Sequence, residues 1–72
     1  MNASSQIPTI ARLLRRPVVQ EITGLSRSSI YAKMADGTFP RPLQIGARAV
    51  AWKESDILEW MAQLPEAGEV HP

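Results

Sequence analysis

Short runs of apolar residues alternate with polar ones along this chain, and their spacing predicts small elements of secondary structure. Val18 and Ile22 lie four positions apart just after Pro17, a residue favoured at the first position of a helix. This pattern predicts a helix over residues 17–23. Before it, Leu13–Leu14 stands between arginines and is compatible with a very short strand.

The same helical spacing returns in the next stretch. Ile30 and Met34 are four positions apart, which predicts a second helix over residues 27–36 with both side chains facing the core. Gly37 suits the residue that closes this helix. The prolines in the sequence 39–42 prevent the helix from continuing, because proline restricts its own backbone and that of the preceding residue.

After Pro42 the period changes from helical to alternating. Residues 43–45 and 49–52 read as two extended runs, and residues 46–48 between them supply a turn that contains a glycine. We therefore expect a short antiparallel hairpin. Such a hairpin beside a pair of helices is a wing, with Arg48 at its tip.

A third helical pattern begins at Glu54 and ends near Pro65. Its acidic first turn suits the helix dipole. Apolar residues recur at i, i+3, i+4 and i+7, namely Ile57, Trp60, Met61 and Leu64. This stripe predicts an amphipathic helix in which Trp60 belongs to the core, with Trp52 packed beside it.

The junction between the first two helices carries the most specific local signal. Gly24 can take the left-handed conformation that ends a helix, and Ser26 can accept a hydrogen bond from the free N–H groups of the next one. This arrangement is typical of a helix-turn-helix, whose second helix presents its first residues to the DNA major groove. Three polar residues occupy that first turn here: Arg27, Ser28 and Ser29.

Charge is distributed unevenly along the 72 residues, although the formal net charge is only +1. All eight lysines and arginines fall in residues 1–53 against two acids, which leaves +6, whereas residues 54–72 carry five acids and no base, which gives −5. Such a separation of basic and acidic residues is expected if the basic part of the protein binds a polyanion, because each phosphate that it neutralises releases counterions and strengthens binding. A chance excess of solvated surface charge is the competing interpretation.

Length and composition exclude several classes of protein. A chain of 72 residues supports one small domain, expected over residues 12–64 between a flexible arm (1–11) and a flexible acidic tail (65–72). There is no cysteine, and His71 cannot build a metal site alone, so neither a metal nor another cofactor is expected. No apolar run approaches the roughly 18 residues of a membrane span, and no secretory signal is present, which favours a cytoplasmic protein without membrane or small-molecule partners.

Catalytic interpretations find little support. Ser26 and its neighbouring serines have no histidine or lysine placed to act as a base, and capping explains them. Glu54 and Asp56 are two positions apart at a helix start, so they do not share a face. We expect no enzymatic activity.

Taken in order, these residues resemble the AlpA-type regulators of phages and prophages, which are similar to excisionases and to the DNA-binding half of MerR regulators. The resemblance covers about fifty residues, from Leu13 to Gln63. The matching pieces are Gly24–Tyr31, Gly37 with Phe39–Pro40, Gly46 with Arg48–Val50 and Trp52, and Ser55, Asp56 and Trp60. It implies a mainly α fold with a small β-hairpin, that is, a winged helix-turn-helix with three helices and a two- or three-stranded wing.

The resemblance also implies roles for single residues. It puts Arg27, Ser28, Ser29 and Tyr31 at the major groove and its flanking phosphates, Arg41 on the DNA backbone and Arg48 on the wing. For Tyr31, partial burial against the first helix and a phosphate hydrogen bond both remain open. Lys33 is the one base left in the second half of its helix, where related proteins often carry more. We therefore expect weak phosphate anchoring and reliance on a second copy bound beside the first.

Two functions from different classes follow from these residues. The first is a sequence-specific DNA-binding transcriptional regulator of a phage or mobile element, associated with the bacterial nucleoid when bound, with control of integrase or excision as one possible role. The second is an adaptor that kept the fold, lost DNA binding and docks on a recombinase or repressor through its acidic end. A salt-dependent DNA titration separates them.

Overall fold

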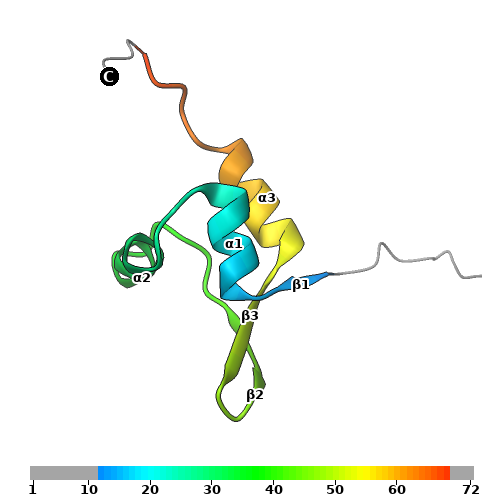
Figure 1. Cartoon of the computed structure of the whole chain (residues 1–72). Helices are drawn as coiled ribbons and strands as arrows, with labels where there is room; N and C mark the ends of the chain where they lie inside the picture. Colours follow the sequence, from blue (N-terminus) through cyan, green and yellow to red (C-terminus); the bar gives the residue numbers. More distant parts are fainter. Residues whose placement is uncertain (1–11, 69–72) are drawn as a thin grey trace, which may run out of the picture.

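The computed structural model describes residues 12–68, and this part of the chain holds three helices and three strands (Figure 1). In chain order they are β1 (Leu13–Leu14), α1 (Arg16–Thr23), α2 (Arg27–Ala35), β2 (Leu43–Gly46), β3 (Ala49–Lys53) and α3 (Glu54–Ala62). The arrangement confirms the expected winged helix-turn-helix. The expected arm and the last four residues of the expected tail, His71 included, lie outside the described residues.

The three strands form one antiparallel sheet in the order β1-β3-β2. β3 lies in the centre and pairs with β1 through Leu14 and Trp52, and with β2 through Leu43 and Ala51. The register shifts between Gln44 and Gly46, so the outer end of β2 is irregular. The predicted two-residue strand is therefore the third strand of the wing.

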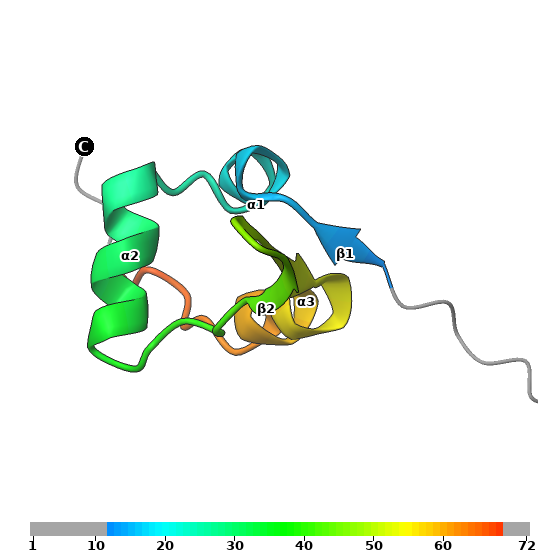
Figure 2. The ribbon, with the colours of Figure 1, turned by 90° about the horizontal axis from the view of Figure 1, so that it is seen from below.

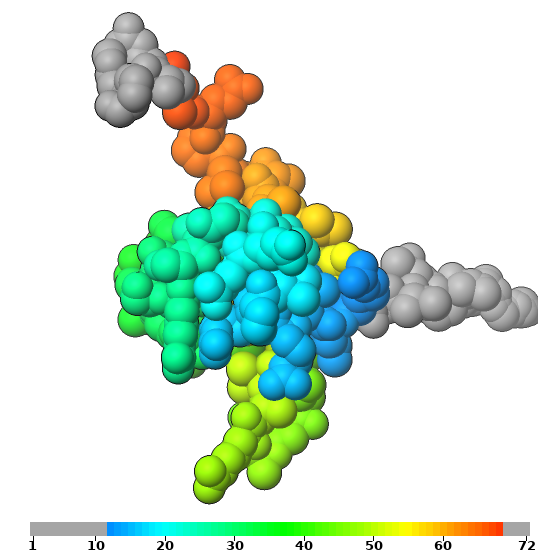
Figure 3. Space-filling view, viewed as in Figure 1, coloured from blue at the N-terminus to red at the C-terminus, as the bar shows by residue number. Residues whose placement is uncertain are grey.

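The helices are arranged around the inner part of β3. Viewed from below in Figure 2, α1 and α3 lie on either side of the sheet, and α2 stands beside them as a separate rod. β3 contacts both α1 and α3, and α1 also contacts α2. The outer part of the β2–β3 hairpin has no helix against it, and it projects from the body (Figures 1 and 3).

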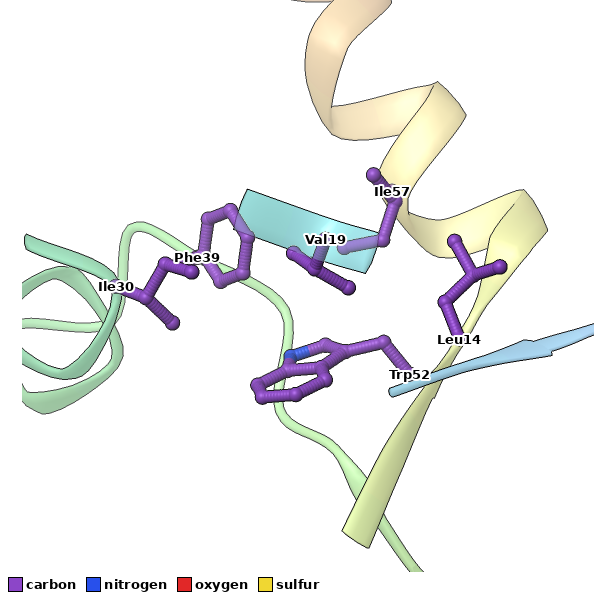
Figure 4. Packing of buried hydrophobic residues seen from close by; sticks show 6 residues of the cluster. All are labelled: Leu14, Val19, Ile30, Phe39, Trp52 and Ile57. Carbon is purple, nitrogen blue, oxygen red and sulfur yellow. The ribbon is translucent and has the colours of Figure 1, made fainter. Parts of the chain in front are cut away.

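One small cluster of buried side chains joins these elements. Figure 4 shows Trp52 at its centre near Val19, with Ile30 and Phe39 on one side; the cluster comprises Leu14, Val19, Ile30, Phe39, Trp52 and Ile57. The Trp52 indole N–H donates to the Pro40 carbonyl at 2.8 Å, so its buried polar group is satisfied. This bond and the burial of Phe39 fix the connection between α2 and β2 to the core.

Two details of the apolar pattern differ from expectation. The pair that predicted α1, Val18 and Ile22, is 38% and 40% exposed, and α1 instead buries Val19 completely. α1 contacts β3, and its orientation against the sheet turns Val19, rather than Val18 or Ile22, into the core.

Leu64 was expected on the apolar stripe of α3, but it lies beyond the end of that helix and is 50% exposed. Pro65 disfavours the helical conformation of the residue before it, which stops α3 at Ala62. Trp60 is half-buried rather than fully buried, and its indole N–H donates to the Thr38 carbonyl at 2.7 Å. Phe39 makes edge contacts with both tryptophans, at 4.8 Å from Trp60 and 6.4 Å from Trp52 between ring centroids.

Candidate nucleic-acid interface

The turn between α1 and α2 is fixed at both ends as the sequence predicts. Gly24 has a φ of 78°, and its N–H donates to the Gln20 carbonyl at 2.8 Å, which closes α1. Ser26 is the N-cap of α2, and its hydroxyl oxygen accepts from the Ser29 N–H at 3.1 Å. Because glycine takes a positive φ without strain and serine satisfies a free helix N–H, this sequence specifies the turn locally.

α2 is anchored on one side and open to solvent on the rest. Ile30 is completely buried and Met34 packs partly against the core, as expected. The other side chains of the helix are exposed or half-exposed, which includes all five site residues expected on it: Arg27, Ser28, Ser29, Tyr31 and Lys33. The helix ends at Ala35, one residue before the predicted end, and Gly37 follows with a φ of 82°. α2 thus presents a polar first turn that the fold leaves accessible.

The serines of this first turn form a connected group of hydroxyls. The Ser26 hydroxyl donates to that of Ser29 at 3.0 Å and lies 3.3 Å from that of Ser28. Ser28 is exposed. A hydroxyl has one donor and two acceptor positions, so these bonds use those of Ser26, whereas Ser28 can still accept from a ligand and Ser29 can still donate to one. The group is therefore equipped to bond phosphate oxygens or base edges.

Arg27 lies over the ring of Tyr31, with 5.7 Å between its guanidinium carbon and the ring centroid. Tyr31 is 39% exposed. Neither of the two interpretations of Tyr31 taken from the sequence includes this contact. The signal for it was present, since residues four apart face each other on a helix.

The wing carries Arg48 at its apex. Ala47 and Arg48 form the two-residue turn of the hairpin, while Gly46, expected in the turn, ends β2. The Gln44 side-chain amide donates to the carbonyls of Gly46 and Ala47, the latter at 3.3 Å, and so braces the turn. Arg48 is exposed, and Figure 3 shows the hairpin standing out from the body of the molecule.

The structure brings most, but not all, of the expected site residues together. Five of them share α2, Arg48 lies on the separate hairpin tip, and Arg41 is exposed in the connection between α2 and β2. In Figure 1, α2 is seen end-on and the hairpin projects downward, so both border one open side of the molecule that α1 and α3 do not cover.

The cations expected at the interface form no salt bridge with other described residues. Within residues 12–68 the one ion pair joins Arg12 to Glu54, at 3.0 Å, on the opposite part of the sheet. A salt bridge therefore holds none of the four cations expected at the interface in the described structure: Arg27, Lys33, Arg41 and Arg48. Unpaired surface cations of this kind are the groups that neutralise phosphates.

Asp36 ends α2 through a local hydrogen-bond pair. The Thr38 hydroxyl donates to its carboxylate at 2.6 Å and the Thr38 N–H donates at 3.0 Å. These bonds, led by that of the hydroxyl and aided by the nearby Lys33 charge, lower the pKa of Asp36 from its ordinary value of 3.8. The same bonds from Thr38 to the Asp36 carboxylate order the end of α2.

Other kinds of site are not found in the described part of the chain. No helix there is long and apolar enough to cross a membrane. Nor do residues 12–68 bring together three or more side chains of the types that bind metals.

Comparison with known proteins gives a consistent result. Residues 12–65 match the model of the family described as "Prophage CP4-57 regulatory protein (AlpA)", a range that includes every helix and strand above. The chain is 44% identical over 54 residues to "Uncharacterized protein ORF88" of Enterobacteria phage P4, which covers 75% of this chain and 61% of that protein. The match thus spans less than two thirds of the phage protein.

A second relative has a printed function. The chain is 38% identical over 58 residues to "DNA-binding transcriptional activator AlpA" of Escherichia coli strain K12, which covers 72% of this chain and 83% of that protein. No solved structure matches. The family model spans the whole folded unit, and the helix-turn-helix, the wing and the cap residues all lie inside it, so this chain belongs to the AlpA family of prophage regulatory proteins.

Proposed function

We propose that this protein is a sequence-specific DNA-binding transcriptional regulator of a phage or other mobile element. In this proposal α2 enters the major groove and the hairpin turn meets the minor groove or the backbone. The observation that carries the proposal is the combination of an exposed polar first turn on α2 with an exposed arginine, Arg48, at the turn of a hairpin that projects from the body of the molecule (Figure 1). This is the layout that winged helix-turn-helix proteins use on DNA.

The proposed roles follow from the chemistry of each side chain. Arg27 offers paired N–H donors that match the acceptors of a guanine edge, and Ser29 can bond to several bases, so these two read sequence. Lys33 and Arg41 contact phosphates, which fixes orientation and carries no sequence information. Arg48 binds the backbone or enters the minor groove, where the negative potential is concentrated.

Family membership supports regulation rather than catalysis. The relative from Escherichia coli is described as a DNA-binding transcriptional activator, and we extend DNA binding and transcription control to this chain. Control of integrase or of excision belongs to the same proposal.

Self-association on DNA is a second part of the proposal. Four cations are expected at the interface, and the second half of α2 contributes only Lys33 among them. A domain this small contacts few base pairs, so a second copy bound beside the first supplies affinity that one copy lacks. Sedimentation of the protein with and without duplex measures this directly.

A mobility-shift titration tests the proposal as a whole. Wild-type protein is titrated with a duplex from the region upstream of its own gene and with a scrambled duplex, at several salt concentrations. About four neutralised phosphates, one for each cation expected at the interface, predict a slope of log K against log salt near −3.6. Arg27→Ala is expected to bind both duplexes similarly, because it removes a reading residue.

The outcome that contradicts DNA binding is equally clear. If the wild type shifts neither duplex at low salt, the adaptor function is favoured instead. Charge reversal at Glu59 and Glu66, two acids on the other end of the molecule, would then abolish capture of the partner protein.

A further inference from the structure

Tyr31 and Arg27 form a pair on the exposed face of α2. The guanidinium carbon of Arg27 is 5.7 Å from the ring centroid, which is within the range of a cation–π contact. Arg27 is the first residue of the helix and is exposed, and neither a hydrogen bond nor a salt bridge holds it within residues 12–68. The ring is therefore the principal contact that restricts this long side chain.

We propose that Tyr31 is a positioning residue that sets base selectivity by holding the Arg27 guanidinium ready for a base edge. This inference deepens the proposed DNA-binding function and rests on it. A guanidinium that lies over a ring spends none of its N–H groups on a hydrogen bond, so the N–H donors of Arg27 remain free for DNA. A carboxylate partner would occupy those same donors, and none is paired with Arg27 in the described structure.

Restriction before binding increases discrimination for a physical reason. An arginine with several free torsions loses conformational entropy when it docks, and it can also turn to an alternative acceptor on a wrong base pair. Contact with the ring removes part of that freedom in advance, so a correctly placed base pair gains more than a misplaced one. Base reading depends on bidentate geometry, which is sensitive to such placement.

Two other roles of Tyr31 make different predictions. If its hydroxyl bonds a phosphate, removal of the hydroxyl weakens binding to every sequence alike. If the ring is merely a surface contact between two residues of α2, its loss changes helix stability and leaves selectivity intact. The substituted side chain and the readout together separate these cases.

The experiment compares Tyr31→Phe with Tyr31→Leu in the full chain. Phenylalanine keeps the aromatic face and lacks the hydroxyl, whereas leucine keeps apolar bulk and helix propensity without the ring. The readout is the ratio of dissociation constants for a scrambled duplex and for a duplex that the wild type enriches from a randomised library. Thermal unfolding of each variant is measured in parallel, and Tyr31→Gln replaces the leucine variant if that variant does not fold.

We expect Tyr31→Phe to keep the wild-type ratio and Tyr31→Leu to lower it about 2- to 5-fold, the range of an exposed cation–π contact. In an Arg27→Ala background, Tyr31→Leu should cause no further loss of selectivity. The inference is overturned if the leucine variant keeps the full ratio, or if the phenylalanine variant falls as far as the leucine variant. If the wild type itself enriches no sequence, the proposed function fails as well, which distinguishes the two failures.

Discussion

Arg48→Ala isolates the contribution of the wing to DNA binding. Arg48 is exposed at the hairpin turn, and within residues 12–68 no acid is paired with it. It is also remote from the reading residues of α2, so its loss leaves the helix unchanged. We therefore expect the variant to keep its base preference and to lose one phosphate contact.

The size of this loss follows from counterion release. One contact contributes about 0.9 to the slope of log K against log salt, so the slope should flatten from near −3.6 to near −2.7. The same relation predicts that binding weakens about 5-fold at 0.15 M salt and about 15-fold at 0.05 M, relative to a 1 M reference. The loss should be equal for the preferred and the scrambled duplex.

Lys53→Ala is the matched control. Lys53 is an exposed cation at the other end of the same strand, β3, about 17 Å from Arg48 for five residues of extended chain. It lies beyond the Debye length from the wing tip at physiological salt, so the slope should stay near the wild-type value. Fluorescence anisotropy at five or more salt concentrations measures both slopes. An unchanged slope for Arg48→Ala, or equal flattening in the two variants, would refute the assignment of the wing.

Two further predictions concern the end of α2. Gly37 has a φ of 82°, and no atom lies near the position that a Cβ would take. Gly37→Ala should therefore destabilise the fold by about 1 kcal/mol through backbone strain alone, and lower the unfolding midpoint by about 4–8 °C. Gly68→Ala is the control, because Gly68 is equally open and has no positive φ, and it should leave the midpoint unchanged. Because hydrogen bonds from Thr38 lower the pKa of Asp36 in the folded protein, the resulting stability is present above the unfolded value near 3.8 and is lost as the pH falls through the folded value. Asp36→Asn should remove this part of the acid dependence in thermal unfolding at a series of pH values, and identical profiles for the two proteins would contradict it.

Local signals account for the parts of the fold that the sequence predicts well. The helix boundaries at Gly24, Ser26 and Gly37 depend on the conformations and hydrogen bonds of single residues, and these act within a few positions along the chain. The hairpin follows from alternation around a glycine-containing turn. Both kinds of signal are independent of tertiary contacts, and the observed elements lie within a few residues of the expected ones.

The sequence-based predictions are wrong where tertiary contacts determine which side chains are buried. Helical periodicity does not distinguish Val18 from Val19, because both lie within one turn of Ile22, and only the position of α1 against the sheet buries Val19. Phe39 is a similar case, because it sits outside any helix or strand and still makes contacts with Trp52 and Trp60. These three aromatic rings come from a connection, a strand and a helix, so no local pattern predicts their packing.

The predicted interface also combines features that the local sequence indicates with features that depend on tertiary packing. The sequence indicates which residues of α2 and of the hairpin turn carry polar chemistry, and the structure leaves those residues exposed. That α2 and the wing border one side of the molecule depends on how β3 packs between the helices (Figures 1 and 2). The pairing of Arg27 with Tyr31 depends on a side-chain conformation that spacing permits but does not determine.

Few contacts attach α2 to the rest of this small protein. α2 is fixed to the rest of the protein mainly by the burial of Ile30, the partial burial of Met34 and the attachment of the following connection through Phe39. Most of its surface is therefore free, which suits a helix that has to enter a groove. Because these few contacts hold α2 in place, substitutions in the core are expected to shift α2 and so to alter the interface.

The most direct test of the central proposal is an NMR titration of the wild-type protein with a duplex that it prefers. We expect the largest changes in backbone amide shifts at Arg27–Ser29 in the first turn of α2 and at Ala47–Arg48 in the hairpin turn, both saturating at the same duplex concentration. The amides of Glu59 on α3 and of Gln63 just beyond its end should change little. Changes confined to α3, or changes in α2 without any at the hairpin turn, would contradict the claim that one duplex touches both.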